Sequence, residues 1–393
     1  MKGREGSSER RPPRIRSARM RYDTDRLIFT PDDVDLSRSP LRQGLPFGST
    51  FVLGAFNPGL AVLPGGNLLM MVRVAEALRE PMTGHVVRGI RWVEGRGYGI
   101  VEWPLAGADV SDPRGFELAG GPNRLMGLTS LSWLLPVELS PDGLEVLAVH
   151  YDRAIGPRAA WQDYGVEDAR ISRIGATWYM TTCSISAQRQ STALYTSRDG
   201  LDWDLRGMVL DHQNKDMLLF EGLIDGVFWA LTRPLGSLYF AWPPDSPFHG
   251  GPSINLATSP DALHWKPVET GGIRPRKGSP ASERVGGGAQ PVLTPDGWLV
   301  LYHGVEAGGT VGTYRTFWAL LDAGDPTRIL RLEDQIAVLE PAPALTAPLK
   351  DRMYLDGVVF TTGLADGGDH WIALSGEADL ACRVTHIPKS VFR

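Results

Sequence analysis

Short hydrophobic runs that follow a glycine turn recur along the chain, and each run ends on a polar residue. The runs combine aromatic and aliphatic side chains, and they are too short for helices but rich in strand formers. They therefore predict β-strands that leave tight turns. The five clearest examples span residues 66–73, 175–180, 225–233, 296–303 and 368–375.

A second pattern, Ser-x-Asp-x-Leu-x-Trp, occurs between these runs, at residues 197–203 and 259–265. Its serine and aspartate suit a polar turn in which side chains bond to the backbone. Its leucine and tryptophan are suited to filling the next hydrophobic layer. We interpret both copies as structural.

The spacing of the runs indicates the fold class. The turn glycines of the last four runs stand 51, 71 and 71 residues apart, about one four-stranded sheet plus loops each time. Together with 46 glycines, 30 prolines and little helical periodicity, this repetition predicts an all-β propeller. A longer gap before Gly175 and a further turn-strand unit at 142–149 mean that the pattern alone does not decide between five and six blades.

Composition narrows the function classes. Hydrophobic content of 42% and charged content of 22% are those of a soluble globular protein, and no run is long enough to span a bilayer. The formal net charge of −5 gives no reason to expect nucleic acid or a membrane surface as a partner. Cys183 and Cys382 are too few for a disulfide framework, so a cytoplasmic location is expected.

The first 26 residues differ from the rest, because nine of them are lysine or arginine and almost none are apolar. Such a segment cannot offset the entropy lost on ordering. We predict a basic, disordered extension over residues 1–26 and a single catalytic domain over residues 27–393.

Basic side chains end several of the predicted strands, namely Arg73, Arg233 and His303. In a propeller such strand ends converge on the central channel. An arginine at the end of an apolar strand is costly to bury unless an anionic or hydroxylated group meets it. Several such residues at equivalent positions predict a shared pocket.

The segment 164–171 places Glu167, Asp168 and Arg170 directly before a strand-like run. Strand alternation predicts Asp168 and Arg170 on one face and Glu167 on the other. Alone, the segment would indicate a structural ion pair.

A glycine-rich stretch at 286–291 lacks the Lys-Ser/Thr ending of a phosphate-binding P-loop. We predict instead that its glycines let the backbone approach the substrate closely.

Six segments stand in order along residues 51–379: Phe56-Asn57-Pro58, Gly165-Val166-Glu167-Asp168-Ala169-Arg170, Lys215-Asp216, Arg233-Pro234, the run 297–304 and Gly376-Glu377-Ala378-Asp379. Together they resemble glycoside hydrolase family 130, which comprises β-mannoside phosphorylases and some β-1,2-mannosidases on a five-bladed β-propeller. The resemblance therefore implies five blades and an inverting phosphorylase that converts β-mannosides and inorganic phosphate to mannose 1-phosphate.

The same resemblance implies a role for each matching residue. The general acid falls on Asp168. The positions expected to bind phosphate are Arg170, Lys215, His303 and Tyr314. The positions expected to hold the mannosyl unit are Asn57, Arg73, Asp216, Arg233 and Asp379.

This assignment is chemically coherent. An inverting glycosidase needs both an acid and a base, whereas an inverting phosphorylase needs only the acid, because phosphate attacks directly. It needs instead a cationic cradle that holds the phosphate in line with the bond to be broken. Inorganic phosphate is then a co-substrate, and neither a metal nor an organic cofactor is expected.

Two alternatives remain open. One is a hydrolase of the same family, with Asp168 as acid and Glu221 or Glu283 as base. The other is a non-catalytic carbohydrate-binding propeller, since propellers often serve as binding platforms. The linkage, the acceptor sugar and the oligomeric state are not decided by the sequence, although members of the family commonly form homo-oligomers.

Overall fold

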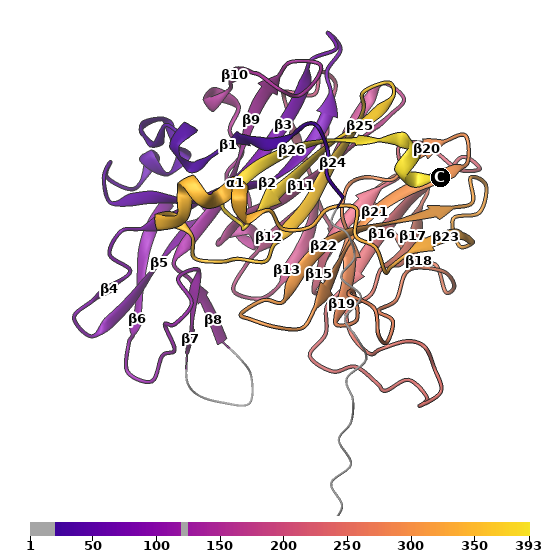
Figure 1. The fold of residues 1–393 in the computed structure, drawn as a ribbon. Coiled ribbons are helices and arrows are strands. Elements are labelled where there is room, and N and C mark those ends of the chain that lie inside the picture. The colour runs from indigo at the N-terminus through magenta and orange to yellow at the C-terminus, as the bar shows by residue number, and fades with distance from the viewer. Residues whose placement is uncertain (1–19, 119–124) are drawn as a thin grey trace, which may run out of the picture.

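Strands dominate the computed structural model, which describes residues 20–118 and 125–393 (Figure 1), and the all-β prediction is confirmed. Helical structure in these residues is confined to short segments. They are the α-helix α1 (Pro343–Thr346) and the 3-10 helices η1 (Pro31–Asp33), η2 (Leu36–Arg38), η3 (Pro40–Gln43), η4 (Tyr151–Arg153), η5 (Ala160–Gln162), η6 (Ala347–Arg352) and η7 (Lys389–Phe392).

The largest sheet has the strand order β14-β13-β12-β11-β9-β3-β2, with β10 paired to β9. All of its pairings are antiparallel except one short parallel contact, Gly165 with Ser132, which joins β11 to β9. Its strands are β2 (Thr50–Val62), β3 (Leu68–Leu78), β9 (Ser130–Leu139), β10 (Val146–Val149), β11 (Gly165–Ile174), β12 (Thr177–Ile185), β13 (Gln190–Ser197) and β14 (Asp204–Leu210).

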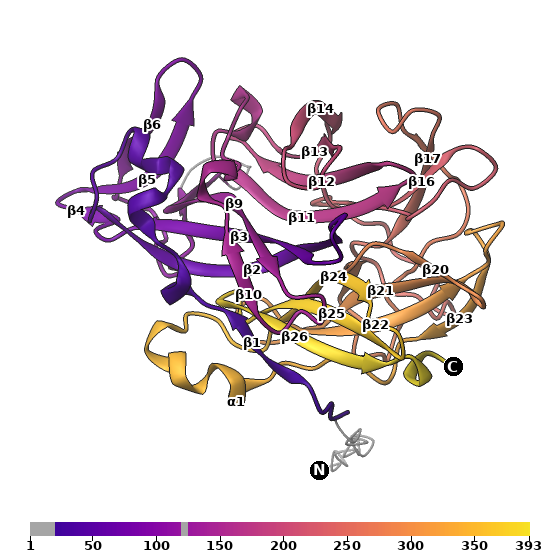
Figure 2. The same cartoon turned by 90° about the horizontal axis from the view of Figure 1, so that it is seen from above.

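Three further sheets follow along the chain, and the last is completed by the N-terminal strand, because β1 pairs with β26. Viewed from above, β2, β11 and β24 lie side by side near the middle of the molecule (Figure 2). The three sheets comprise β15 (Asn214–Leu219), β16 (Phe228–Pro234), β17 (Asn255–Ser259) and β18 (Lys266–Pro267); β19 (Arg284–Gly287), β20 (Val292–Thr294), β21 (Gly297–Glu306), β22 (Thr313–Leu321) and β23 (Ile329–Glu333); and β24 (Val359–Asp366), β25 (His370–Glu377), β26 (Ala381–Pro388) and β1 (Asp25–Phe29).

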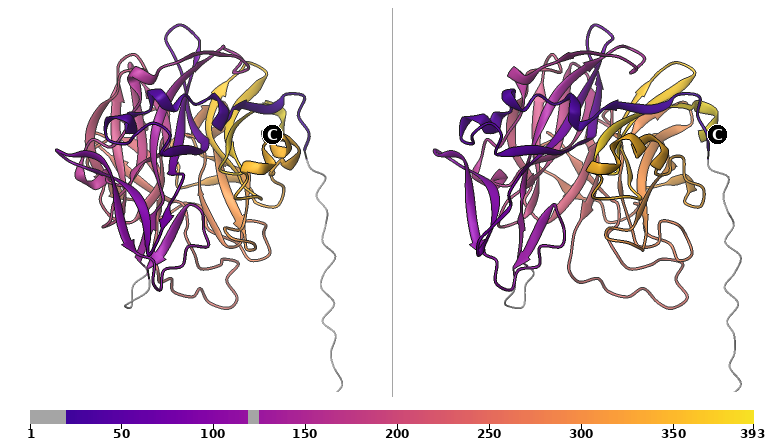
Figure 3. Two further views of the ribbon diagram at one scale, coloured as in Figure 1. Left: turned by 90° about the vertical axis from the view of Figure 1, so that its left-hand side faces the viewer. Right: turned by 60° about the vertical axis from the view of Figure 1, so that its left-hand side comes forward.

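An insertion between β3 and β9 forms two small antiparallel sheets outside this series. It extends from one side of the molecule, at the lower left in Figure 1, and Figure 3 turns that side toward the viewer. This insertion explains why the predicted repeat is interrupted before Gly175. Its strands are β4 (Met82–Thr83), β5 (Val86–Val93), β6 (Gly97–Pro104), β7 (Gly115–Leu118) and β8 (Leu125–Leu128).

The five predicted turn-strand runs are all strands, corresponding to β3, β12, β16, β21 and β25. The repeated Ser-x-Asp turn is also confirmed. Ser197 and Ser259 each donate to the aspartate two residues on, at 3.0 and 3.1 Å. Those aspartates, Asp199 and Asp261, accept hydrogen bonds from the backbone that follows.

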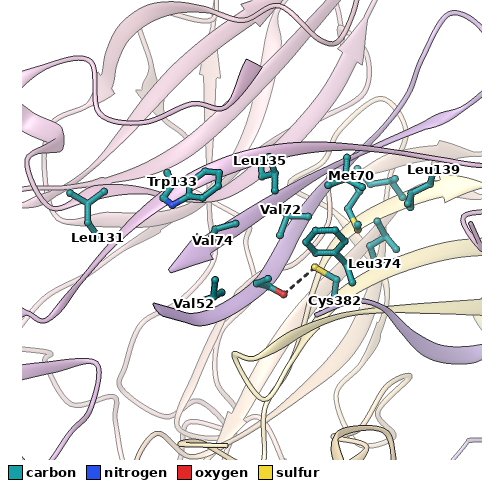
Figure 4. Packing of buried hydrophobic residues seen from close by; sticks show 14 of the residues in the cluster. Val52, Met70, Val72, Val74, Leu131, Trp133, Leu135, Leu139, Leu374 and Cys382 are labelled. Carbon is teal, nitrogen blue, oxygen red and sulfur yellow. Dashed lines mark hydrogen bonds between the residues drawn. The ribbon is translucent and has the colours of Figure 1, made fainter. Parts of the chain in front are cut away.

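The core lies where sheets meet, and one cluster packs β3 and β9 against β25 and β26 (Figure 4). Trp133 and Leu135 of β9 and Leu374 of β25 are completely or almost completely buried in it. Cys382 of β26 donates to the backbone oxygen of Ala55 in β2 at 3.4 Å. Since both faces of these strands are covered, their side chains are held in fixed positions.

Arg383 closes the last sheet. Its guanidinium is 2% exposed in side-chain terms and contacts Asp25 of β1 at 2.6 and 2.8 Å and Glu377 of β25 at 2.8 Å. A third acceptor is the backbone oxygen of Glu340, at 3.0 Å. Every nitrogen of this guanidinium therefore has a hydrogen-bond acceptor.

Part of the predicted N-terminal extension, residues 1–19, lies outside the described residues. Beyond it, the Tyr22 hydroxyl donates to the backbone oxygen of Val338 at 2.8 Å, and β1 begins at Asp25. Over residues 20–118 and 125–393, no helix has the length and hydropathy needed to cross a membrane.

Candidate active site

A cavity of about 430 Å³ opens between several strands, and Arg73 and His303, which the sequence predicted as strand ends, lie inside β3 and β21. It receives side chains from β2, β3, β11, β15, β16, β21 and β22 and from the turn after β25. Nine of the ten residues named from the sequence line it: Asn57, Arg73, Asp168, Lys215, Asp216, Arg233, His303, Tyr314 and Asp379. The predicted convergence is therefore confirmed, although their individual roles stay predictions.

Four of the lining residues have a left-handed backbone. Their φ angles are 48° at Asn57, 52° at Asp168, 55° at Asp216 and 49° at Asp379. In β2, β11 and β15 the pairing register shifts where these residues lie. Aspartate and asparagine tolerate this conformation better than most residues, yet it remains costly. Such strain concentrates at functional sites, and here it turns polar side chains toward one cavity.

The bulge in β11 makes the predicted alternation wrong. Glu167 and Asp168 both line the cavity, and Arg73 bridges them, with 2.7 Å to Glu167 Oε1 and 2.9 Å to Asp168 Oδ1. The register shift between Glu167 and Arg170 removes the period-two pattern on which that prediction depended. Glu167 is thus a cavity residue that pattern reasoning placed on the wrong face.

Asp168 lies among positive charges. Its Oδ1 accepts hydrogen bonds from Asn57 Nδ2 at 3.0 Å and from Arg73. Burial alone would raise the pKa of Asp168, but the cations of Arg73, Arg170 and Lys215 outweigh burial and hold that pKa well below its usual value. Asp168 is therefore ionised at neutral pH when the cavity holds no other anion.

Lys215 lies on the other side of Glu167, with its Nζ 3.5 Å from Glu167 Oε2. Burial would lower the pKa of Lys215, but the Glu167 carboxylate outweighs it and raises that pKa above its usual value. The ammonium group is therefore charged throughout the physiological range. Its partial exposure leaves it accessible to an anion in the cavity.

Of the ten residues predicted to act as the acid or to bind phosphate or the mannosyl unit, only Arg170 does not line the cavity. Its Nε donates to the backbone oxygen of Gly288 at 2.7 Å, and its Nη1 donates to that of Asp168 at 2.8 Å. Its Nη2 makes no hydrogen bond and lies 3.6 Å from Asp216 Oδ1. Arg170 therefore supports the backbone of the bulge from behind the cavity wall.

A second group of charges surrounds Asp216. Arg233 Nε lies 2.9 Å from Asp216 Oδ2, and Arg233 Nη1 lies 3.1 Å from His303 Nε2. Burial and the nearby arginines hold the pKa of His303 well below its usual value. The imidazole is therefore neutral, with Nε2 accepting from Arg233 and Nδ1 placed to donate to Gly287 at 3.3 Å. The Tyr314 ring stacks on it at 5.5 Å between centroids.

Asp379 faces the same cavity from the turn after β25. Burial raises its pKa to about 6, and Arg73 opposes that rise while the charge of Asp168 adds to it. The Tyr354 hydroxyl donates to the backbone oxygen of Asp379 at 2.6 Å and so fixes the turn. Asp379 thus changes charge just below neutral pH.

The two carboxylates suggested as bases for a hydrolase are not among the described residues that line the cavity. Glu221 lies beyond the other end of β15, where it accepts a hydrogen bond from the backbone of Arg173 at 3.2 Å. Glu283 is paired with Arg284, whose guanidinium also donates to the Tyr314 hydroxyl at 3.0 Å.

The cavity rim includes residues that the sequence did not indicate. Asp112 and Arg114 form a paired contact at 2.6 Å on the side of the insertion, and Gln190 and Gln213 lie among the lining residues from the main sheets. For Asp112 and Arg114, the only signal in the sequence is the long gap before Gly175, which marks the insertion that carries them. Within the two described ranges, no group of three or more candidate ligands is arranged to hold a metal ion.

Comparison with known proteins places this geometry in a family. A sequence profile described as β-1,4-mannooligosaccharide phosphorylase, of glycoside hydrolase family 130, matches residues 131–392. The chain belongs to glycoside hydrolase family 130. The resemblance inferred from the motifs is thereby confirmed.

Among curated family 130 relatives, a β-1,2-mannobiose phosphorylase from Listeria innocua serovar 6a is 31% identical over 363 residues, covering 91% of this chain and 93% of that protein. A 1,2-β-oligomannan phosphorylase from a Thermoanaerobacter species is 29% identical over 248 residues, covering 61% of this chain and 74% of the relative. The solved structure of the Listeria innocua β-1,2-mannobiose phosphorylase with β-1,2-mannobiose has a TM-score of 0.75 and 28% identity, covering 93% and 97% of the two chains.

Proposed function

We propose that this chain is an inverting β-mannoside phosphorylase that uses inorganic phosphate to cleave mannobiose or manno-oligosaccharides, with mannose 1-phosphate as product. The observation that carries the proposal is the position of the Asp168 carboxylate, which pairs with Arg73 and feels the charges of Arg170 and Lys215, in a cavity of about 430 Å³. The curated relatives at 31% and 29% identity are both named as phosphorylases of β-1,2-linked mannosides.

In the proposed reaction, a phosphate oxygen attacks the anomeric carbon on the face opposite the leaving sugar. The glycosidic carbon–oxygen bond breaks and the configuration at the anomeric carbon inverts. A proton from Asp168 passes to the leaving oxygen by way of a substrate hydroxyl, which is the route that the family resemblance implies. Lys215 supplies positive charge for the phosphate, and His303 and Tyr314, whose rings stack on each other, line the same cavity. Arg170 acts from behind the wall by holding the Asp168 backbone.

The low pKa of Asp168 has a consequence for this step. A general acid must carry a proton, whereas Asp168 is ionised in the empty cavity. A phosphate dianion bound beside the same cations offsets their charge and raises the pKa of Asp168. Binding of phosphate therefore prepares the acid as well as supplying the nucleophile.

The mannosyl unit is proposed to bind against Asn57, Arg73, Asp216, Arg233 and Asp379. Their carboxylate, amide and guanidinium groups match sugar hydroxyls as acceptors and donors. Inorganic phosphate is the co-substrate, and the proposal includes no metal, organic cofactor, nucleic acid or membrane partner. The two cysteines are free and buried, in keeping with a cytoplasmic protein.

We further infer that the sheets form the blades of a five-bladed propeller. The large sheet divides at the single parallel contact between β9 and β11, which gives five units in all. The inner strands contact one another in sequence: β2 with β11, β11 with β15, β15 with β19, the β21–β22 pair with β24, and β24 with β2. This ring of contacts supports a central channel with the cavity at one end.

The test is an assay with β-1,2- and β-1,4-mannobiose, each with and without inorganic phosphate. We expect α-mannose 1-phosphate and mannose in equal amounts, only when phosphate is present. Equal release of mannose without phosphate would instead identify a hydrolase. Binding of either disaccharide without any cleavage would identify a carbohydrate-binding propeller.

A further inference from the structure

Glu167 is a buried carboxylate to which the proposed reaction gives no role. Its side chain is 6% exposed and it lines the cavity. One oxygen accepts a hydrogen bond from Arg73 Nη2 at 2.7 Å, and the other lies 3.5 Å from Lys215 Nζ. Among the carboxylates of the described residues, Glu167 alone pairs with Lys215.

This position is unfavourable for simple anion binding. A negative charge beside Lys215 repels an incoming phosphate dianion and cancels part of the positive charge that attracts it. A neutral side chain of the same size would bind phosphate more tightly. The carboxylate nevertheless turns inward, because the bulge in β11 directs both Glu167 and Asp168 toward the cavity.

A carboxylate between two cations also fixes both of them. Arg73 is held by Glu167 and Asp168 together, and Lys215 has Glu167 as its anchor. A lysine side chain without a partner samples many rotamers, so an anchored ammonium group binds its target in one geometry. Reaction in line with the scissile bond depends on such positioning.

We propose that Glu167 is a positioning residue that holds Lys215 and Arg73 beside Asp168 and moderates the affinity for phosphate in favour of turnover. This inference rests on the proposed phosphorylase function. It separates two quantities that a purely structural residue would change together, namely the affinity for phosphate and the turnover number.

The variant Glu167→Gln keeps the size and an acceptor for Arg73 but removes the charge. Phosphate binding is expected to tighten about tenfold, because a like charge a few ångströms away is lost. Turnover is expected to fall about tenfold, because Lys215 loses its anchor. The variant Glu167→Asp keeps the charge but is shorter, so phosphate affinity stays near that of the wild type while turnover falls.

A second readout is the pH dependence of turnover. Loss of the Glu167 charge lowers the pKa of Asp168 further, so the alkaline limb that requires protonated Asp168 moves to lower pH in Glu167→Gln. The limb should stay in place in Glu167→Asp. The other charged, titratable or hydrogen-bonding groups around Asp168 remain in both variants: Asn57, Arg73, Arg170, Cys183, Lys215 and Asp379.

The experiment is calorimetric titration of the full chain with inorganic phosphate, together with phosphorolysis kinetics, for the wild type and both variants. Asp112→Asn is the matched control, since it removes a carboxylate at the cavity rim that pairs with Arg114 rather than Lys215. Its phosphate affinity should change by less than about twofold, because the two side chains are each 33% exposed and ion pairs that reach the solvent contribute little. The proposal is supported if Glu167→Gln binds phosphate more tightly and turns over more slowly, and Asp112→Asn does neither.

Phosphate affinity that is unchanged or weaker in Glu167→Gln overturns it. If circular dichroism shows that this variant does not fold, Glu167→Asp decides: wild-type affinity with slower turnover supports the proposal, and weaker affinity overturns it. A wild type that neither binds phosphate nor forms mannose 1-phosphate contradicts the proposed function itself, which is a distinguishable result.

Discussion

Two groups of buried charges, one around Arg383 and one around the cavity, differ in how completely their polar atoms are paired. Around Arg383, every guanidinium nitrogen has an acceptor from Asp25, Glu377 or the backbone of Glu340. In the cavity group, Asn57 Oδ1 on the wall and Arg170 Nη2 behind it have no hydrogen-bond partner.

The backbone differs in the same way. Asn57, Asp168, Asp216 and Asp379 all have positive φ, whereas Asp25, Glu377 and Arg383 lie in regular paired strands. The Arg383 cluster, in which every guanidinium nitrogen has an acceptor and the strands are regular, joins the first and last strands of the chain within one sheet and has no need of a ligand. The cavity cluster, an unsaturated cluster on strained backbone, keeps polar atoms without a protein partner, and these can bind a ligand.

The largest effect that this comparison predicts is at Asp168. Asp168→Asn should reduce the formation of mannose 1-phosphate at least about 10³-fold, because the group that supplies the proton is lost. Asparagine tolerates the left-handed backbone, so the fold should be kept. Initial rates measured alongside circular dichroism check this, and activity close to that of the wild type would remove Asp168 as the acid.

The converse effect is expected at Arg383. Arg383→Met leaves the buried Glu377 and the half-buried Asp25 without their cationic partner, and should lower the free energy of unfolding by about 3–5 kcal/mol. The turnover number of the folded variant should be that of the wild type, since Arg383 does not line the cavity. Denaturant unfolding measures the free energy of unfolding, and kinetics below the melting temperature measure the turnover number. Lost turnover with unchanged stability would contradict the assignment of Arg383 to the fold rather than to the site.

Substitution of Lys215 tests which substrate this part of the cavity binds. Lys215→Ala should raise the KM for phosphate about 30-fold, since a charge-assisted contact is worth about 2 kcal/mol. The KM for the mannoside should change much less, because Lys215 is assigned to the phosphate. Steady-state kinetics with each substrate varied in turn measure the two constants, and equal changes in both would contradict that assignment.

The smallest effect is the pH dependence at Asp379. With a pKa of about 6, its carboxylate takes up a proton as the pH falls below 6 and becomes a weaker acceptor for sugar hydroxyls. The KM for the mannoside should therefore rise several-fold between pH 7 and pH 5. Asp379→Asn should have a higher KM that lacks this step, and an unchanged step in the variant would assign it to another group.

The sequence predicted the strands and the convergence of the site because both depend on local pattern. Turn glycines and apolar runs locate β3, β12, β16, β21 and β25, and motif order locates the polar residues that line the cavity. These signals survive in sequence because each is carried by a few neighbouring residues.

Features that depend on backbone irregularity or on distant partners could not be predicted in the same way. Strand alternation misplaced Glu167 because a bulge in β11 interrupts the period. Arg170 lies behind the wall because its acceptors are backbone oxygens, one of them at Gly288, far along the chain. The neutral state of His303 follows from burial beside Arg233, which sequence spacing does not reveal.

The most direct test of the account is the initial rate of β-1,2-mannobiose cleavage as inorganic phosphate is varied down to zero. If the unsaturated cluster binds phosphate as the attacking group, the rate follows a saturation curve that passes through zero without phosphate, and every cleavage yields one α-mannose 1-phosphate. A rate at zero phosphate equal to that at saturation, with free mannose as the sole product, would contradict it.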